Sequence, residues 1–421
     1  MVILLNYCGE GELNLSGQRG HILVVDDNEM NRLKLSMGLK KQGHTVLQAE
    51  GGQRALEMLR AEPFDLLLLD ILMPGIDGYQ VLREMKGDEL LRDIPVIVIS
   101  ALNEMDSIVT AIELGAEDYL PKTFDPVLLK ARIGACLEKK RLRDNEQLYL
   151  KGLERELEIG RQIQAGFLPE KLPQPPGWEI AARLQPARQV AGDFYDAFVT
   201  GHDNKIGLVI GDVCNKGVGA ALFMTLFRSL IRAIANFEHF TRKNLRLMEF
   251  NDFTGESDRA IISDEINLKH TVQLTNDYIA ITHSQAHMFS TLFFGLLDSN
   301  TGSLVYINGG NEPPIIVGPN GIKSKLLRTG PVVGLFPGID YQVASAHLEP
   351  GDILFAFTDG VTDAQNPEGE LFSQERLITL LDSPVGSTPA LLNKIETALQ
   401  AHAASADQYD DITMLAVRRI P

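Results

Sequence analysis

Cysteine is scarce in this sequence, which has only three, Cys8, Cys136 and Cys214, among its 421 residues. The three lie far apart and follow none of the spacings with which cysteines ligate metals, so the sequence predicts no zinc site built from them. Scattered cysteines of this kind are the default of a chain that works in the reducing cytoplasm. Long apolar runs are lacking as well, because no run approaches the roughly 20 consecutive apolar residues of a membrane span.

Positive charge is in deficit, since 39 lysine and arginine residues stand against 56 aspartate and glutamate residues and leave a formal net charge of −17. This balance argues against general nucleic-acid binding and against association with an anionic membrane surface. It suits sites that collect divalent cations, although solubility alone also favours it. The remaining composition is ordinary, 44% hydrophobic and 23% charged, and the length predicts two or three domains.

The chain begins with a short apolar stretch, MVILLNYC, at residues 1–8. No basic segment precedes it, and residues 9–12 alternate glycine with glutamate where a secretory signal would have small residues for cleavage. We therefore expect residues 1–20 to form a disordered leader and not a signal peptide.

Four short apolar runs in the first third of the chain each end at a polar or charged residue. They are residues 22–25 before Asp26 and Asp27, residues 66–69 before Asp70, residues 96–99 before Ser100, and residues 119–120 before Pro121 and Lys122. Between them lie amphipathic stretches with helical spacing, such as residues 51–60 and 107–114. This alternation predicts an α/β doubly wound parallel sheet, whose right-handed crossovers bring all strand ends to one edge.

Three carboxylates, an amine and a hydroxyl meet at that predicted edge. Asp26 and Asp27 beside Asp70 would repel one another strongly unless a cation lay among them, and oxygen ligands of this kind select Mg²⁺. A carboxylate held by the ion can accept a phosphoryl group, whose charge Mg²⁺ and the ammonium of Lys122 would neutralise. Ser100 can then donate a hydrogen bond to a phosphoryl oxygen. The sequence therefore predicts Asp70 as a phosphoacceptor.

Residues 21–138 as a whole resemble the receiver domain of bacterial response regulators, and Tyr119 matches the switch aromatic of that family. The resemblance implies that a sensor histidine kinase or a phosphotransfer protein phosphorylates Asp70. It also implies that Ser100, Tyr119 and Lys122 respond to the phosphoryl group.

A helical connector is predicted at residues 139–168, which are rich in leucine, glutamate, lysine and arginine. An apolar stripe runs along it at coiled-coil and i,i+4 spacing, formed by Leu150, Leu153, Leu157, Ile159, Ile163 and Phe167. Two interpretations stay open: a helix that forms a homodimer through a coiled coil, and a single surface helix packed on its own domain. Prolines between residues 169 and 176 end the helix, and residues 169–421 form the next domain.

Aspartates also stand at the ends of short β-like runs throughout this second domain. They are Asp193, Asp212, Asp359, Asp410 and Asp411. Each one alone is typical of a turn. As a set without a cysteine or histidine pattern, they indicate an oxygen-lined site for Mg²⁺ or Mn²⁺ and not for zinc. Four acidic groups can hold two ions about 4 Å apart, and water bound to such ions attacks phosphate esters.

The order of these motifs resembles the metal-dependent serine/threonine protein phosphatases of the PPM family, in the SpoIIE-like branch. The matching segments are residues 161–169, 192–196, 211–224, 290–298, 308–314, 358–364 and 410–413. The resemblance implies an α+β sandwich of central antiparallel β-sheets flanked by helices.

The same resemblance implies the ligands of two Mn²⁺ or Mg²⁺ ions. They are Asp212, the backbone carbonyl of Val213, Asp359 and Asp410, with Asp193 binding directly or through water. Since neighbouring residues of a strand face opposite sides, only one of Asp410 and Asp411 should point inward, and Asp410 is favoured.

Some positions depart from the family patterns. Thr123 stands where receivers usually have a proline, often after a cis peptide, which leaves the local loop geometry open. Ala191 replaces a common glycine, Cys214 and Asn215 replace the usual Ser-Gly, and residues 308–311 lack the histidine often found there. None of these changes removes a ligand carboxylate, and Cys214 is expected to be a small buried residue.

Two further features have no secure counterpart in the family. Residues 237–268 are charged and longer than the family needs at this point, and we expect a flap or insertion. The family's phosphate-binding arginine is not identifiable, and Arg183 and Arg188 are the candidates.

The main hypothesis is a cytoplasmic, phosphorylation-controlled phosphatase that acts on phosphoserine or phosphothreonine proteins. By the resemblance, its substrate is a phosphorylated anti-sigma-factor antagonist of the STAS type in a partner-switching pathway. The alternative is a catalytically weak adaptor that uses the phosphatase fold as a docking surface. A DNA-binding response regulator is disfavoured, because no basic recognition helix follows residue 139.

Overall fold

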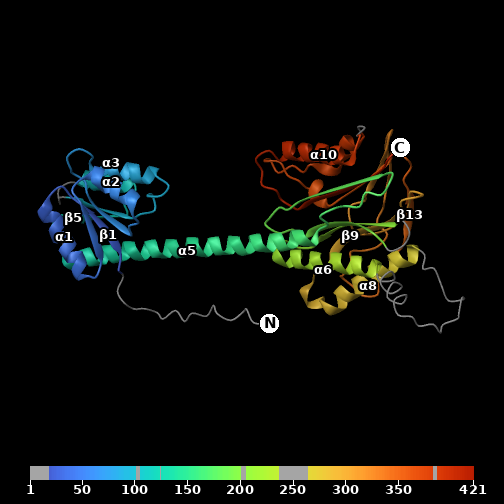
Figure 1. Ribbon diagram of the computed structural model, residues 1–421, viewed down its shortest axis with the longest axis horizontal. Coiled ribbons are helices and arrows are strands. Elements are labelled where there is room, and N and C mark those ends of the chain that lie inside the picture. Colours follow the sequence, from blue (N-terminus) through green and yellow to red (C-terminus); the bar gives the residue numbers. More distant parts are fainter. Residues whose placement is uncertain (1–18, 101–104, 124, 201–204, 237–263, 383–385) are drawn as a thin grey trace. The chain divides into compact units, whose positions relative to one another are not determined.

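A computed structural model of the chain describes residues 19–100, 105–123, 125–200, 205–236, 264–382 and 386–421 (Figure 1). The chain divides into two compact units, residues 1–153 and residues 154–421, and each is described by itself. Nearly all of the predicted leader and most of the predicted insertion at 237–268 lie outside the described residues. The end of that predicted insertion is not a flap, because residues 264–268 begin a helix and Leu268 is fully buried.

The first unit contains a five-stranded parallel sheet in the order β2-β1-β3-β4-β5. Its strands are β1 (His21–Val25), β2 (Thr45–Ala49), β3 (Leu66–Asp70), β4 (Val96–Ser100) and β5 (Asp118–Pro121). Its helices are α1 (Glu29–Lys41), α2 (Gly52–Ala61), α3 (Gly78–Gly87), α4 (Met105–Glu113) and the start of α5 (Pro126–Phe167). The predicted doubly wound α/β fold is confirmed.

The four leucines of β3 show why this strand lacks alternation. Leu67 and Leu69 pack with residues of α2 and α3, whereas Leu66 and Leu68 pack with residues of α1 and α5. All four are fully buried, and burying each side chain contributes about 1.5–3 kcal/mol before entropy is counted. At the strand's end, a Cβ on Gly78 would lie 2.4 Å from the carbonyl oxygen of Asp70, so only glycine lets α3 begin so close.

Helix α5 is longer than the connector predicted at 139–168. It spans 42 residues as one element, since it includes the last helix of the receiver (Figure 1). Near its start Leu129 and Ile133 are buried in the core of the first unit. Five of the six residues of the predicted apolar stripe are exposed, from 38% at Phe167 to 60% at Ile163, whereas Leu157 is half-buried. Another face of the helix packs on the second unit, where Gln164 is buried and bonds the backbone of Ala191.

The second unit is a sandwich of two five-stranded antiparallel sheets, in the orders β13-β10-β9-β8-β7 and β12-β11-β14-β15-β6. The strands are β6 (Trp178–Gln185), β7 (Asp193–Val199), β8 (Lys205–Val213), β9 (Ser290–Asp298), β10 (Ser303–Gly309), β11 (Ile315–Gly318), β12 (Gly321–Lys325), β13 (Ala344–His347), β14 (Ile353–Phe357) and β15 (Ile412–Arg419). Helices α6 (Val218–Ala235) and α8 (Asp264–Thr282) cover the outer face of the first sheet, and α9 (Ser373–Leu381) and α10 (Thr388–Ala403) cover that of the second (Figure 1).

Adjacent strand residues in this sandwich serve different cores. In β8, Leu208 packs between the sheets, while Val209 packs under α6 and α8. Phe293 and Phe294 of β9 divide in the same way. The predicted α+β sandwich with helices on its outer faces is confirmed, and the alternation explains why its strands read as continuous apolar runs.

Helix α6 is apolar and long enough, by composition alone, to pass as a candidate membrane span, and among the described residues it is the only such helix. This is weak evidence, because core helices pass the same test. Phe227 and Ile231 of α6 are fully buried in the core that the helix shares with the first sheet.

Candidate functional site

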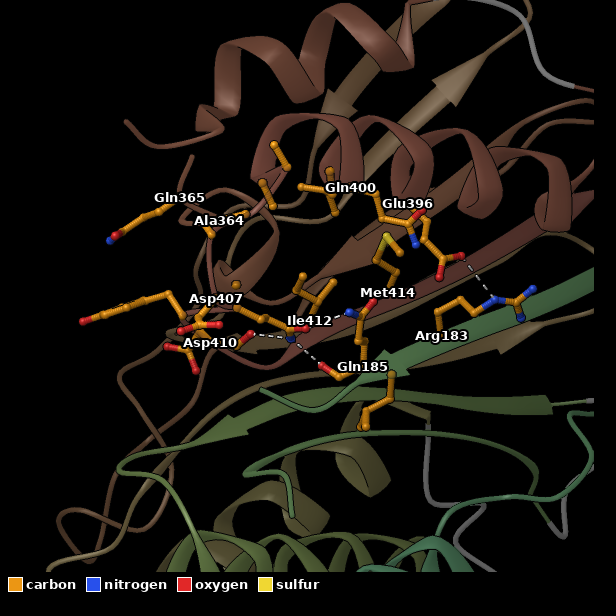
Figure 2. Close-up of a pocket in the computed structure, with 18 residues that line it drawn as sticks. Arg183, Gln185, Ala364, Gln365, Glu396, Gln400, Asp407, Asp410, Ile412 and Met414 are labelled. Carbon is orange, nitrogen blue, oxygen red and sulfur yellow. Dashed lines mark hydrogen bonds and ion pairs between the residues drawn. The ribbon is translucent and has the colours of Figure 1, made fainter. Parts of the chain in front are cut away.

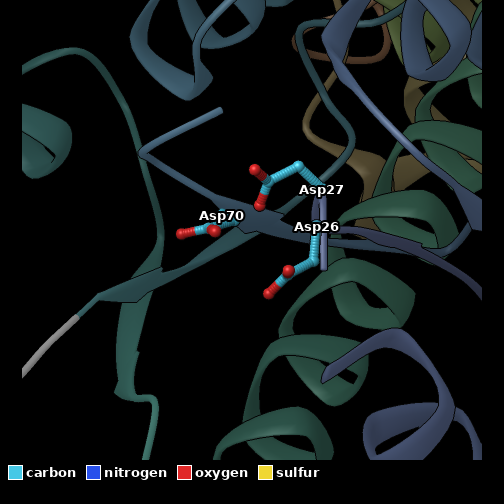
Figure 3. Close-up of side chains that lie close together, drawn as sticks. All are labelled: Asp26, Asp27 and Asp70. Atoms are coloured by element: carbon cyan, nitrogen blue, oxygen red, sulfur yellow. The ribbon is translucent and has the colours of Figure 1, made fainter. Parts of the chain in front are cut away.

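The predicted carboxylates of the first unit converge at the carboxyl edge of its sheet (Figure 3). Asp26 and Asp27 follow β1, and Asp70 ends β3. One oxygen of each lies within 4.8 Å of the others, close enough for a single ion to contact all three. Asp26 and Asp70 are buried, whereas Asp27 is exposed and leaves a side open to solvent.

The amine of Lys122 lies 2.8 Å from Asp70 Oδ2, as the sequence predicted. The other oxygen, Asp70 Oδ1, is buried and makes no hydrogen bond to any described residue. Burial raises the pKa of Asp70, while the hydrogen bond from Lys122 opposes this shift. An oxygen that is buried, negatively charged and unpartnered fits a bound cation.

The remaining predicted receiver residues are placed in part. Tyr119 is half-buried in β5, and the guanidinium of Arg132 lies 5.0 Å from the centre of its ring. Ser100 ends β4 beside Pro121, but its side chain lies outside the described residues.

Four carboxylates of the second unit come from four separate elements. Asp193 begins β7 directly opposite Asp212 of β8, and the two strands belong to one sheet. Asp359 begins a short 3₁₀ helix (Asp359–Val361) after β14. Asp410 precedes β15. A Cβ on Gly360 would lie 1.9 Å from the carbonyl oxygen of Asp411, so glycine is required for the last two segments to meet.

The pKa values of these carboxylates show that they share one electrostatic field. Burial raises the pKa of Asp212 to about 7, together with the negative charges of Asp359 and Asp410. Burial contributes most to this shift, and Asp359 contributes more than Asp410. Burial and then Asp212 raise the pKa of Asp193, and burial and then Asp410 raise that of Asp359. Thr358 supports Asp193 by donating a 2.7 Å hydrogen bond to its Oδ2.

This second group is more open than the first. Within the described part of the chain, only the receiver group brings oxygens of three acidic residues within 4.8 Å of one another. The carboxylates of the second unit are therefore spread more widely than three ligands of a single ion.

Asp410 and Asp411 differ sharply in their surroundings. Both oxygens of Asp411 accept backbone hydrogen bonds, from Ala187 N and Gly192 N, each at 2.7 Å. Asp411 is thus occupied in holding the loop that leads into β7. The charges of both residues raise the pKa of Asp212, and that of Asp410 also raises the pKa of Asp359, so the hydrogen bonds of Asp411 are what set the two residues apart. Val213 is the last residue of β8 and lies beside Gly192. A Cβ added to Gly192 would lie 3.0 Å from the carbonyl oxygen of Val213.

Sequence reasoning missed Lys216, which lies in the loop between β8 and α6. Its Nζ lies 3.0 Å from Asp410 Oδ2, donates to the carbonyl oxygen of Tyr409 and stands 4.3 Å from the centre of the Tyr409 ring. The available signal was a lysine shortly after the acidic end of a strand, since β8 ends with Asp212 and Val213. The two arginine candidates are less central: Arg183 lies 4.0 Å from Glu396, and Arg188 is exposed.

Cys214 is half-buried and not fully buried as predicted. Its sulfur accepts a hydrogen bond from Phe289 N, and burial raises the pKa of the thiol. A thiol with a raised pKa is a poor nucleophile, so the structure gives no reason to assign chemistry to it.

The raised pKa of Asp212 predicts a pH dependence of stability. Because the pKa in the folded chain, about 7, exceeds the ordinary value of 3.8, the folded state binds the proton more tightly. Stability from this group is therefore complete below about pH 4 and is lost as the pH rises through about 7. With chelator present, we expect the Tm to fall over this window and Mn²⁺ to restore it at high pH. Calorimetry checks this; an equal pH slope in wild type and Asp212→Asn would contradict it.

Comparison with known proteins shows which families two segments of the chain match. Residues 22–134 match the sequence model of the response regulator receiver domain, and residues 202–420 match that of stage II sporulation protein E (SpoIIE). Protein IcfG of Synechocystis sp. is 45% identical over 268 residues, which cover 63% of this chain and 41% of that protein. The regulator PhoB of Pseudomonas aeruginosa is 38% identical over 125 residues, 30% of this chain and 55% of that protein.

Among solved structures, the SiaA-PP2C domain of Pseudomonas aeruginosa matches with a TM-score of 0.50 and 18% identity, covering 64% of this chain and 98% of that domain. At this identity the likeness concerns the fold alone. The chain spans 41% and 55% of the two curated relatives named above, so it corresponds to only a part of each.

Proposed function

Because this chain belongs to the SpoIIE family and carries a receiver domain ahead of the matching segment, we propose that it is a receiver-controlled protein phosphatase that requires divalent metal and acts on phosphoserine or phosphothreonine. The observation that carries the proposal is a group of carboxylates from four segments of the SpoIIE-type unit, in which Asp193 is buried and the pKa values of Asp193, Asp212 and Asp359 are raised by burial and by neighbouring carboxylates. An adaptor has no use for such a group, because assembling it costs electrostatic free energy.

We assign the roles as follows. Asp212, the carbonyl of Val213, Asp359 and Asp410 hold two Mn²⁺ or Mg²⁺ ions, and Asp193 binds directly or through water. The set fits these ions, since all its donors are oxygens. Bound there, the ions supply an activated water and neutralise charge on the phosphoryl group.

Other residues of the chain support this site. Asp411 fixes the backbone of Ala187 and Gly192, which orients the entry to β7. Thr358 holds the carboxylate of Asp193 through its hydroxyl. Lys216 contributes an ammonium group beside Asp410, where it favours the approach of a phosphate dianion.

The test of the enzyme is hydrolysis of a phosphoserine protein and of p-nitrophenyl phosphate by the full chain. We expect turnover with Mn²⁺ and none after chelation by EDTA. A chain that binds a phosphoprotein tightly but never releases phosphate, with metal present, would be the adaptor instead.

In the receiver unit, we propose that Asp70 accepts a phosphoryl group from a sensor histidine kinase or a phosphotransfer protein in the cytoplasm. Asp26, Asp27 and Asp70 hold Mg²⁺, with Lys122 paired to the acceptor and Ser100 and Tyr119 as the switch residues. From the family, the substrate of the phosphatase is a STAS-type anti-sigma-factor antagonist. Hydrolysis assayed with and without a beryllium fluoride mimic at Asp70 tests the control.

A direct connection links α5 to the proposed metal site. Gln164 is buried, and its amide exchanges two hydrogen bonds with the backbone of Ala191, at 2.6 and 3.0 Å. The next residues are Gly192, which donates to Asp411, and Asp193. A shift of the end of α5 must therefore be transmitted to this loop.

We expect Gln164→Leu to weaken that connection, because the backbone groups of Ala191 lose their partner at a cost of about 1–3 kcal/mol. The change in phosphatase rate caused by beryllium fluoride should then largely disappear. Gln162→Leu is the matched control, since Gln162 is exposed and bonds only Glu158 among the described residues. An unchanged response in Gln164→Leu would contradict this coupling.

The exposed apolar stripe of α5 supports a homodimer formed through this helix. Leu150 is 51% exposed and Ile159 49%, and a partner helix would bury both. Sedimentation equilibrium should give twice the 46.4 kDa mass of the chain, and a monomer at all concentrations would contradict the dimer.

A further inference from the structure

A cavity of about 220 Å³ lies next to the proposed metal site in the second unit (Figure 2). Asp410 and Gly360, which belong to the metal site or adjoin it, also line the cavity. Its apolar wall includes Leu399 of α10 and Met414 of β15. The cavity therefore adjoins the place where we expect phosphate to bind.

The size and lining of the cavity limit what it can hold. An apolar cavity of about 150 Å³ accommodates benzene, whereas pockets for drug-sized ligands run from about 300 Å³ upward. A volume of about 220 Å³ therefore fits one aliphatic or aromatic side chain and is too small for a cofactor. Four residues of α10, Glu396, Leu399, Gln400 and Ala403, line it at the spacing of one helix face.

The cavity is held open by hydrogen bonds between distant segments. The side chain of Gln185 donates to Gln408 Oε1 at 2.7 Å, and Gln408 Nε2 donates to the carbonyl oxygens of Gln185 and Asp410 at 2.9 and 2.7 Å. These bonds tie the loop before β15 to the end of β6. A pocket built in this way loses little entropy when a side chain enters it.

The charges around the cavity are mostly negative. Asp407, Asp410 and Glu396 line it together with one cation, Arg183, which is already paired with Glu396. In Figure 2, Arg183 and Glu396 lie across the cavity from Asp410. This arrangement opposes an acidic residue at the bound position, and the apolar wall favours an aliphatic one.

We propose that this cavity, the flank pocket, binds an aliphatic side chain of the phosphoprotein substrate, at a position near the phosphorylated residue. The inference rests on the proposed function and adds to it a rule for substrate choice. The substrate segment lies across Asp410. Its phosphate points toward the aspartates of the proposed metal site, and its neighbouring aliphatic side chain occupies the flank pocket.

Phosphoserine peptides that carry leucine, alanine or aspartate at each nearby position test the proposal. For the full chain with Mn²⁺, kcat/KM and the peptide Kd are both measured. At one position we expect leucine to exceed alanine by roughly tenfold, because filling an apolar pocket is worth about 1–3 kcal/mol, and aspartate to be poorest. Equal values for leucine and alanine at every position would overturn the flank pocket.

Ala403→Phe fills the cavity and should reduce the ratio of leucine to alanine towards one. Ala401→Phe is the matched control, because Ala401 is exposed on another face of α10 and should keep the wild-type ratio. A full leucine preference in Ala403→Phe would also overturn the proposal, and thermal unfolding verifies that both variants fold.

Because hydrolysis and peptide binding are measured separately, the flank pocket and the proposed phosphatase can fail independently. Hydrolysis of phosphopeptides with Mn²⁺ but without a preference for leucine over alanine would support the proposed phosphatase and contradict the flank pocket. Selective binding of the leucine peptides without any hydrolysis, abolished by Ala403→Phe, would support the flank pocket and contradict the proposed phosphatase.

Discussion

Asp212→Asn should lower the kcat for Mn²⁺-dependent hydrolysis of a phosphoserine protein by a factor on the order of 10³. The substitution keeps the shape of the side chain but removes the charge that we assign to both the binding and the alignment of metal. Electrostatic groups of this kind contribute several kcal/mol to the transition state. Because Asp212 has a raised pKa in a crowded acidic site, the variant should be at least as stable as wild type without metal.

Asp298→Asn is the matched control for this experiment. Asp298 ends β9 opposite Lys205, at the other end of β8 from Asp212, and pairs with Lys205 at 2.8 Å. Losing this ion pair costs about 0–1 kcal/mol of stability and leaves the aspartates of the proposed metal site unchanged. If Asp212→Asn kept a rate close to that of Asp298→Asn, the assigned metal site would be wrong.

Asp70→Asn should reduce phosphoryl incorporation from acetyl phosphate to background. An amide cannot form the acyl phosphate, and neither Asp26 nor Asp27 is paired with Lys122 as Asp70 is. Any effect of phosphorylation on the phosphatase rate should vanish with it. Intact-protein mass spectrometry measures the incorporation.

The control is Asp77→Asn, since Asp77 follows the same strand but caps α3 through Gln80 N. Asparagine caps helices about as well as aspartate, so folding is preserved. Incorporation at the wild-type level in Asp70→Asn would move the phosphoacceptor to another residue.

Much of the fold was predictable because the evidence for it is local. The unbroken leucines of β3 predicted a strand buried on both faces, and right-handed crossovers then placed Asp70 beside Asp26. In the second unit, aspartates at strand ends carried the resemblance to a known family. These patterns need only neighbouring residues and general rules of topology.

The contacts that could not be predicted join residues far apart in the chain. Gln185 and Gln408 are 223 positions apart, and Asp411 and Gly192 are 219 apart. No local pattern distinguishes a glutamine that builds a pocket wall from one that faces solvent. The sequence also does not mark where the receiver's last helix ends and the connector begins, because the two have the same helical spacing and no breaker between them.

Counting bound Mn²⁺ by electron paramagnetic resonance tests the central claim most directly, namely that each unit has its own carboxylate site for divalent cations. We predict about three ions per wild-type chain, one in the receiver and two in the SpoIIE-type unit. Asp212→Asn should lose ions only from the second site, and Asp70→Asn only from the first. An Asp212→Asn chain that binds as many ions as wild type, with equal affinity, would contradict the account.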